Sequence, residues 1–482
     1  MPRPRAPRAV AAAVLLPLAL GGCGLGRWLT PDATGAGLAL PERLRTADAS
    51  LAADWPDPEW WRGFGSPELD ALMRETIASN QTIAVAVAQL EQADALLRIA
   101  GAPLLPQATL TGQATRSQTT LSTSTASLGV GGLARKPTRK FSSDNLSLAG
   151  SYEIDFWGRN RAALESAQQS QAAARFNVGA VAITTEASVA NTYFALLAAQ
   201  EQLAIQQENL ETAQRVLGVL RARLTVGTAT GLDVAQQEAV VAQLNAQVPP
   251  LVQSAEQNRN ALATLAGRAP AAIEIRGGDL ARLRVPAPAP GLTAQVLVRR
   301  PDVWLSEANL AAASANVVVA RAQLLPTVTL TASGGFQSLA LESLLQPGSA
   351  IFTLASAVTQ PIFRGGALIG QVRLSEAQAR ELLADYRQAI LSALQDTEDA
   401  VVALRQSTEQ ERLQAEAVRA AERAYALSEE QLRVGTIDLV TLLNTQQTLF
   451  NARNQLVTAQ LARLQAAVAL FRALGGGWDT TA

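Results

Sequence analysis

Two kinds of hydrophobic spacing alternate along the chain. In 107–115, apolar Ala108, Leu110 and Ala114 are separated by Gln and Thr residues, and 145–154 and 327–336 repeat this alternation. The segment at about 351–363 follows it less strictly. A period of two is typical of β-strands, and about ten residues is the length of a strand that crosses an outer membrane. A soluble sheet with one wet face shows the same alternation, so these segments alone leave both interpretations open.

Long helical segments follow the strands. Leucine recurs at every seventh position from Leu196 to Leu224, with small or polar residues at the intermediate seam positions. This repeat and the absence of proline predict long coiled-coil helices over about 158–226 and 366–434, each on the order of 100 Å long. Shorter return helices are expected over about 233–265 and 440–474. Pro249 and Pro250 are expected to kink or interrupt the first of them.

The chain contains an internal duplication. Leu104–Thr111 matches Leu324–Thr331, and Val226-Gly227-Thr228 matches Val434-Gly435-Thr436 in the same order. Two copies of one structural unit are therefore predicted, joined by a Pro/Gly-rich connector that we expect on the surface. The expected organisation is a signal segment 1–22, an N-terminal segment with a first helix 23–80, a first repeat 81–266 with a hairpin at about 106–156, a linker 267–298, a second repeat 299–475 with a hairpin at about 326–363, and a tail 476–482.

The N-terminus has the pattern of a secretion signal. Three arginines precede an apolar stretch, 9–20, that is too short to span a bilayer as a helix. The segment ends Gly21-Gly22-Cys23 and resembles a bacterial lipobox, which implies cleavage before Cys23 and acylation of that residue. An ordinary signal peptide with an incidental cysteine is the alternative. No later stretch reaches 18 uncharged apolar residues, so no transmembrane helix is expected in the mature chain.

Composition excludes several classes of chemistry. The chain has 40 basic and 41 acidic residues, no histidine and one cysteine. It therefore has no charge excess for binding nucleic acid, no histidine for metal ligation or a Ser-His-Asp triad, and no internal disulfide. The acidic residues are scattered over helix faces. We expect neither an enzyme nor a metal or other cofactor.

Four strands in one chain cannot seal themselves in a membrane. An open sheet has two unpaired edges, which lipid does not tolerate, so closure requires more than one copy. Two copies give eight strands and a filled interior, whereas three give twelve and a lumen. We expect the Thr/Ser/Gln face to line the pore and the Leu/Ala/Gly/Val face to contact lipid. Aromatic residues expected near the strand ends, at the membrane interfaces, are Tyr152, Phe156, Trp157, Phe336 and Phe363.

The loop between the first two strands, 116–140, is rich in Ser, Thr and Gly and is expected outside the cell. It carries the only lysines of the chain, Lys136 and Lys140, beside Arg135 and Arg139. Two interpretations stay open for this basic group: contact with anionic lipopolysaccharide, or plain solvation.

Several motifs together carry a family resemblance. They are Trp60-Trp61, Tyr152–Arg159 (YEIDFWGR), Arg299-Arg300-Pro301-Asp302, Pro361–Gly366 (PIFRGG) and Ala473–Trp478 (ALGGGW). With the duplication, they resemble the NodT/OprM-type outer-membrane efflux lipoproteins of the TolC-like outer membrane factor family. The resemblance implies a mainly α-helical protein with membrane β-structure. It forms a homotrimer with a twelve-stranded barrel and a periplasmic helical tunnel.

The resemblance also implies partners. Such proteins are exit ducts for small molecules and work with a periplasmic adaptor and an inner-membrane RND-type pump; beyond the lipid on Cys23, no cofactor is implied. A protein-secretion duct of type I with the same fold is an alternative, and lipidation and the NodT-like motifs count against it. A periplasmic adaptor or coiled-coil lipoprotein without a pore is a second alternative, against which stand the two hairpins with their amphipathic strands.

The two Gly-Thr turns hold the implied contact and gating residues. In the family these turns form the periplasmic tip, so the resemblance assigns adaptor contact to Gly227, Thr228, Asp233, Gly435 and Thr436. Asp233 is alternatively a helix N-cap. Where several family members place aspartate rings at the entrance, this chain has Thr441 and Asn444. The remaining candidates for the constriction are Asp438, Leu439, Val440 and Leu442.

Overall fold

The computed structural model describes residues 37–38, 45, 57–120, 138–286 and 300–478. The predicted signal segment, the lipidation residue Cys23 and most of the loop 116–140 lie outside the described residues. The chain forms two compact units. We call 93–171 with 309–383 the sheet unit, and the described parts of 36–92, 172–308 and 384–482 the helical unit.

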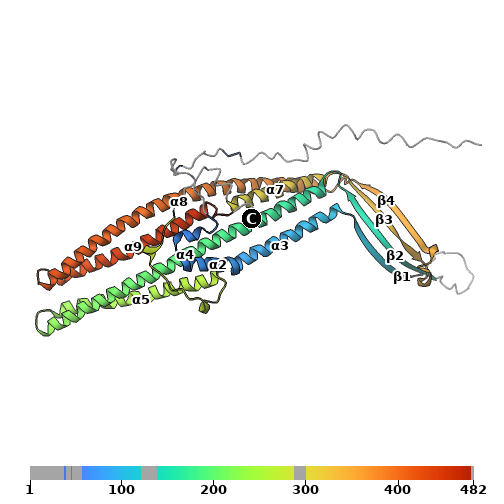
Figure 1. Cartoon of the computed structure of the whole chain (residues 1–482). Coiled ribbons are helices and arrows are strands. Elements are labelled where there is room, and N and C mark those ends of the chain that lie inside the picture. Colours follow the sequence, from blue (N-terminus) through green and yellow to red (C-terminus); the bar gives the residue numbers. More distant parts are fainter. Residues whose placement is uncertain (1–36, 39–44, 46–56, 121–137, 287–299, 479–482) are drawn as a thin grey trace, which may run out of the picture. The chain divides into compact units, whose positions relative to one another are not determined.

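The duplication is visible in the element lengths (Figure 1). Helices α4 (Arg159–Thr225) and α8 (Ala367–Arg433) have 67 residues each, and their partners α5 (Gly231–Leu265) and α9 (Leu439–Ala473) have 35 each. Helix α3 (Gln81–Gly101) precedes the first strand pair as α7 (Pro301–Ala322) precedes the second. Each repeat is thus one helix, two strands and a long antiparallel helical hairpin.

The sheet unit contains four antiparallel strands in the order β1-β2-β3-β4. They are β1 (Gln107–Thr120), β2 (Thr138–Ile154), β3 (Thr327–Ser338) and β4 (Ala350–Thr359). Strand β4 ends at Thr359, whereas the sequence pattern predicted that the strand continues to about residue 363. Pro361 has no N–H to donate to a ladder. Phe363 therefore lies beyond the strand end and is 87% exposed.

The strand register sorts the side chains onto two faces. Leu110 lies opposite Leu148, Leu148 opposite Gly334, and Gly334 opposite Phe352. Because side chains alternate along a strand, the neighbouring row, 109-149-333-353, belongs to the other face and contains Thr, Ala, Ser and Thr. The apolar face stays uncovered within one chain, as the 69% exposure of Leu110 and the 82% exposure of Phe352 show.

Aromatic residues at the start of the described chain organise the core of the helical unit. The 3₁₀-helix η1 (Trp60–Phe64) and helix α2 (Pro67–Ser79) pack against α4 and α9. Trp60 stacks on Phe471 with 5.0 Å between ring centroids, and Phe64 lies 5.0 Å from Phe194. The Trp-Trp motif of the sequence is thus a core element that joins the N-terminal segment to both repeats.

The linker is more buried than the surface connector that the sequence predicted. Its described part contains two short 3₁₀-helices, η3 (Pro270–Ala272) and η4 (Leu280–Arg282). Ile273 and Ile275, two residues apart in an extended segment, and Leu280, at the start of η4, are buried in the main core. The carboxylate of Glu68 on α2 also accepts the backbone N–H groups of Arg276 at 2.8 Å and Gly277 at 3.3 Å. The described linker is therefore fixed to the core.

The first return helix also differs from expectation. Helix α5 begins at Gly231 and continues through Pro249 and Pro250 without the interruption that the sequence suggested. Both prolines are exposed, as are residues 245 and 246, whose carbonyls lose their helical donors. Water can satisfy these carbonyls, so the helix tolerates the pair.

Among the described residues, helix α7 is long and apolar enough to cross a membrane by length and composition, with a mean hydropathy of 1.2. Of its apolar window, 39% is buried against other elements. Core helices of multi-helix proteins have the same composition.

Candidate functional site: the turns of the two helical hairpins

Both hairpins turn through the same backbone motif. The N–H of Gly227 donates to the Leu224 carbonyl at 3.1 Å, and the N–H of Thr228 donates to the Arg223 carbonyl at 2.9 Å. Gly435 and Thr436 repeat these bonds in the second hairpin, at 3.2 and 2.9 Å. This is the Schellman ending, in which the glycine takes a left-handed conformation. Gly227 has φ of 74° and Gly435 has φ of 79°, so glycine is required at both positions.

The return helices start with two different caps. In the first turn the hydroxyl of Thr230 accepts the N–H of Asp233 at 3.2 Å, and the Asp233 carboxylate accepts the N–H of Thr230 at 2.8 Å. Thr230 is therefore the N-cap, and Asp233 lies three residues into a capping box rather than at the N-cap that the sequence analysis considered. The helix starts earlier than about 233 for this reason.

In the second turn Asp438 itself is the N-cap. Its carboxylate accepts the N–H of Thr441 at 2.9 Å and the Thr441 hydroxyl at 2.5 Å. These bonds lower the pKa of Asp438, the larger contribution coming from the Thr441 side chain. Hydrogen bonds from the backbone and side chain of Thr230 likewise lower the pKa of Asp233. Both turns thus carry an ionised carboxylate at neutral pH, at different positions.

Apolar residues just behind the turns hold the two hairpins together. Leu220 of α4 packs with Leu439 and Leu442 of α9, and Val216, Val234 and Leu432 surround them. Leu439 is 7% exposed and Leu442 is 2% exposed within a single chain. These two leucines, which the sequence offered as candidates for narrowing the entrance, are buried in the seam between the hairpins within one chain.

The other predicted residues are accessible. Asp438 is exposed while it caps α9. The other exposed candidates are Gly227, Thr228, Gly435, Thr436, Val440, Thr441 and Asn444. Sequence reasoning missed an apolar rim beside the glycines. Val226 is 72% exposed, Leu232 66% and Val434 59%. The available signal was a valine directly before each Gly-Thr pair, Val226 and Val434. The turns therefore present backbone, threonine and aliphatic groups to a partner, with one carboxylate each.

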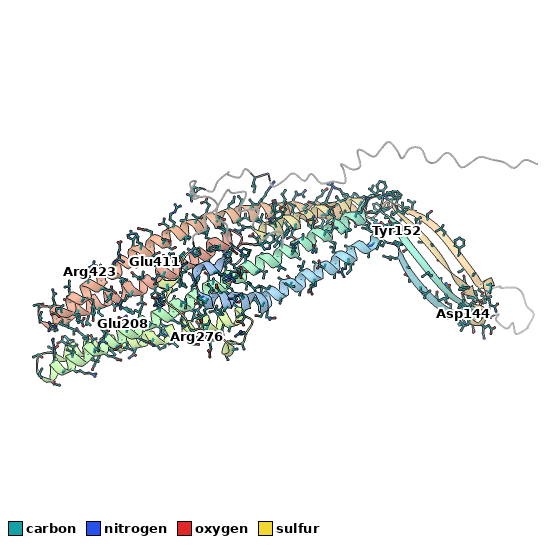
Figure 2. The ribbon with its side chains drawn as sticks, in the orientation of Figure 1. Asp144, Tyr152, Glu208, Arg276, Glu411 and Arg423 are labelled. Carbon is teal, nitrogen blue, oxygen red and sulfur yellow. The ribbon has the colours of Figure 1, made fainter. Side chains whose placement is uncertain are left out.

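Further along the hairpins, one arginine joins three helices. Arg453 of α9 pairs with Glu208 of α4 and with Glu422 of α8, both at 3.2 Å. Figure 2 labels Glu208 on its helix. The three side chains border a cavity of about 280 Å³, where the amide nitrogens of Asn209 and Gln446 are buried without a hydrogen-bond partner among the described residues. The seam between the hairpins is polar and incompletely packed at this level.

A second arginine fixes the start of the second repeat. Arg300 is buried, and its guanidinium donates to the Asp302 carboxylate at 3.0 and 2.6 Å and to Asp396 at 3.1 Å. It also donates to the carbonyls of Ala393 and Ala473, both at 3.4 Å. Burial alone would raise the pKa of Asp302, but the hydrogen bond and charge of Arg300 outweigh it and lower that pKa. The Arg-Pro-Asp motif therefore joins α7, α8 and the end of α9.

The chain has an amphipathic four-stranded sheet whose strands have the length of membrane strands. The sheet is connected to two long hairpins that end in matched turns. These features define a channel protein of the outer membrane. The sequence profile described as "Outer membrane efflux protein" matches residues 72–268 and 292–476. The chain belongs to this family, and the predicted fold class, mainly α with TolC-like membrane β-structure, is confirmed.

Relatives with assigned names are similar over nearly their whole length. The chain is 40% identical to "Pyoverdine export outer membrane protein OpmQ" of Pseudomonas putida, over 96% of this chain and 97% of the relative. It is 30% identical to "Toluene efflux pump outer membrane protein TtgC" of Pseudomonas putida, over 92% and 93%.

Solved structures show the same fold. The outer-membrane channel OprN superposes with a TM-score of 0.84 at 25% identity, over 93% of this chain and 99% of that one. The open-state MtrE channel of Neisseria gonorrhoeae superposes with a TM-score of 0.82 at 27% identity, over 93% and 98%. Family and relatives are transport proteins of the outer membrane, and this chain is an outer-membrane efflux duct.

Proposed function

We propose that three copies of this chain form the exit duct of a tripartite, RND-type efflux system. The observation that carries the proposal is the sheet. It has one apolar face and one Thr/Ser face, and its two end strands, β1 and β4, have no further strand partner among the described residues. Hydrocarbon does not tolerate such edges. Twelve strands from three copies close the edges and leave a lumen lined by the polar face.

The hairpin turns are the contact with the periplasmic adaptor. Val226, Leu232 and Val434 supply exposed apolar area, and the Schellman glycines keep the backbone accessible. Adaptor docking buries this rim, and the carboxylates of Asp233 and Asp438 favour a partner with basic groups nearby. Asp438, Val440, Thr441 and Asn444 are the exposed candidates for the constriction, whereas Leu439 and Leu442 are buried in the seam within one chain.

A siderophore of the pyoverdine type is the leading candidate for the substrate. The relatives named for pyoverdine export share 40% and 39% identity with this chain, whereas those named for toluene or antibiotic efflux share 30%. Aromatic solvents and antibiotics are the second candidate class.

Lipid on Cys23 anchors the N-terminus in the membrane. In support, the described parts of the following segment are attached to the second repeat. Leu38 packs beside Val303 and Ile390, and the N–H of Arg45 donates to the carboxylate of Glu398. The 14 residues between Cys23 and Leu38 can extend about 50 Å when fully stretched.

Three experiments test these proposals. A strain lacking the gene is complemented with the wild type, and export of pyoverdine and resistance to toluene and to antibiotics are compared. Restoration of pyoverdine export alone supports the siderophore assignment, and restoration of resistance alone contradicts it. Single-channel conductance in planar bilayers tests the duct itself: no conductance after confirmed insertion, even with the turns truncated, rejects a pore. Mass spectrometry of the mature N-terminus tests acylation of Cys23.

A further inference from the structure

An ion pair lies on the apolar face of the sheet. The Arg116 guanidinium donates to both oxygens of the Asp144 carboxylate, at 2.7 and 2.8 Å. Asp144 lies opposite Ala114, so strand alternation places its side chain on the face that carries Leu110 and Leu148. Arg116 shares that face because it lies two residues beyond Ala114. The Asp144 side chain is 2% exposed, whereas that of Arg116 is 53% exposed.

The pair marks one border of the apolar band. On β2 this face carries Leu146, Leu148, Gly150, Tyr152 and Ile154 and then changes to Asp144 at the loop end. Figure 2 shows Asp144 and Tyr152 toward opposite ends of the sheet. From Leu146 to Ile154 a tilted strand rises about 20 Å, close to the roughly 25 Å apolar band of outer-membrane barrels. Arg116 and Asp144 therefore lie at headgroup level on the side of the β1–β2 loop.

A second cation lies beside Arg116. Lys140 pairs with Gln118 across the strands, while Arg116 pairs with Ser142, so Lys140 and Arg116 are diagonal neighbours on one face. Diagonal neighbours in a sheet are about 7–8 Å apart, within the span of one phosphate group for two long side chains. Lys140 is exposed.

Of the two strand pairs, the first carries an excess of positive charge. Residues 107–152 contain five basic residues and one acidic residue, Asp144, whereas 327–360 contain no basic residue and one acidic residue, Glu342. The whole chain has a net charge of −1. A local excess of four positive charges in a neutral protein is selective for anions.

We propose that Arg116 and Lys140 bind the phosphorylated headgroup of an outer-leaflet lipid, a lipid A phosphate, whose acyl chains lie along Leu110, Leu146 and Leu148. The inference rests on the membrane placement of the sheet under the proposed function. Asp144 is a positioning residue, since its two-point contact holds the Arg116 plane in a fixed orientation. Guanidinium suits the planar, multi-point contact with phosphate, and the ammonium of Lys140 adds a point charge.

The test measures lipid binding to the purified full-length assembly by native mass spectrometry and thermal shift. The probes are bisphosphorylated lipid A, dephosphorylated lipid A of the same acylation, and inorganic phosphate. The variants are Lys140→Gln and the double variant Arg116→Gln/Asp144→Asn, which leaves no unpaired buried carboxylate. Arg282→Gln, at a side chain 86% exposed in the helical unit, is the matched control.

We expect each variant to weaken binding of bisphosphorylated lipid A about tenfold and to leave the dephosphorylated lipid unchanged, with the control like the wild type. Equal binding of both lipids by the wild type overturns the proposal, as does unchanged binding by both variants. If inorganic phosphate binds as well as lipid A, the site binds a free anion rather than a lipid headgroup, and the proposal is also overturned. Conductance of the same variants in planar bilayers reports on the duct separately, and we expect it to be unchanged.

Discussion

Thr230 and Asp438 occupy the same position in the two hairpin turns, and each caps the helix that follows by accepting the N–H of the third residue along. Their partners are exchanged as well: the threonine cap faces Asp233 and the aspartate cap faces Thr441. The duplicated turn has kept its backbone and its two cap residue types while exchanging their order. The carboxylate therefore lies at the N-cap in the second hairpin (Asp438) and three residues after the N-cap in the first hairpin (Asp233).

Replacing the first cap tests its contribution. Thr230→Ala removes the acceptor for the Asp233 N–H and leaves that donor to water, so we expect a loss of about 1 kcal/mol in local helix stability. Hydrogen exchange at the first turn of α5 measures it. Thr230→Ser keeps the hydroxyl and should exchange like the wild type; equal acceleration by both variants would contradict the capping role.

The second cap should depend on pH. Since hydrogen bonds from Thr441 lower the pKa of Asp438, its contribution is complete above the ordinary aspartate pKa and is lost as the pH falls through the lowered value. Hydrogen exchange at the start of α9, corrected for intrinsic rates, should therefore rise several-fold below about pH 4. Asp438→Asn should remove most of this dependence, and an unchanged profile would exclude Asp438 as its source.

The glycine of the second turn should be essential for coupling to the adaptor. Gly435→Pro cannot adopt φ of 79° and removes the N–H that bonds Leu432. We expect normal membrane insertion but at least a tenfold loss of export in the complemented strain. Gly218→Ala is the control, because Gly218 is a helical glycine with open space around its Cβ position and should gain about 0.5–1 kcal/mol. Normal export by Gly435→Pro would count against the tip as the contact site.

Breaking the buried arginine cluster should destabilise the helical unit. Arg300→Ala leaves Asp302 and Asp396 without their partner. Removing one member of a fully buried ion pair costs about 3–5 kcal/mol, and we expect a smaller loss here because both carboxylates are 44% exposed to water. Arg300→Lys should recover less than half, since an ammonium cannot replace the two-point contact with Asp302. Thermal unfolding of the detergent-solubilised protein measures both. A change in Tm no larger than that of the exposed-site variant Arg282→Gln would show that the cluster contributes little.

Glu186 should make stability fall as pH rises. Burial raises its pKa to about 7, although the Trp60 indole, 3.3 Å away, donates to the carboxylate and lowers the pKa somewhat. The folded state therefore holds a proton that the unfolded state releases, and stability is lost as pH increases from about 4.5 to about 7. Glu186→Gln should raise the Tm at pH 8 by a few degrees and flatten this dependence. A variant with the same pH profile as the wild type would contradict the assignment.

Local periodicity was sufficient to predict the element types. The leucine heptads of α4 and the strict alternation in β1 and β3 each specify one secondary structure, and the repeated Gly-Thr pair located both turns. Other features depend on contacts between distant segments, which periodicity does not encode. The burial of Ile273 and Leu280 in the linker requires knowledge of what α2 and α4 leave uncovered.

The candidate site was predicted in part for the same reason. Position in the sequence identified Leu439 and Leu442 as near the tip, but only the pairing of α9 with α4 shows that they face the seam. The Arg116–Asp144 pair was not predicted, because the two residues meet only once the strand register is fixed. For Asp233 the sequence left two alternatives, adaptor contact or a helix N-cap; the hydrogen bonds show that Thr230 is the N-cap, and adaptor contact stays a prediction.

The order β1-β2-β3-β4 has a genetic consequence. Because β1 and β4 are the end strands of every copy, a subunit with a defective end strand leaves the adjoining strand of an intact neighbour unpaired. Co-expression of a full-length allele with a proline substituted within β4 should therefore act dominantly over the normal allele. The loss of export would then be proportional to the fraction of assemblies that contain at least one defective subunit, which is larger than the fraction of defective chains.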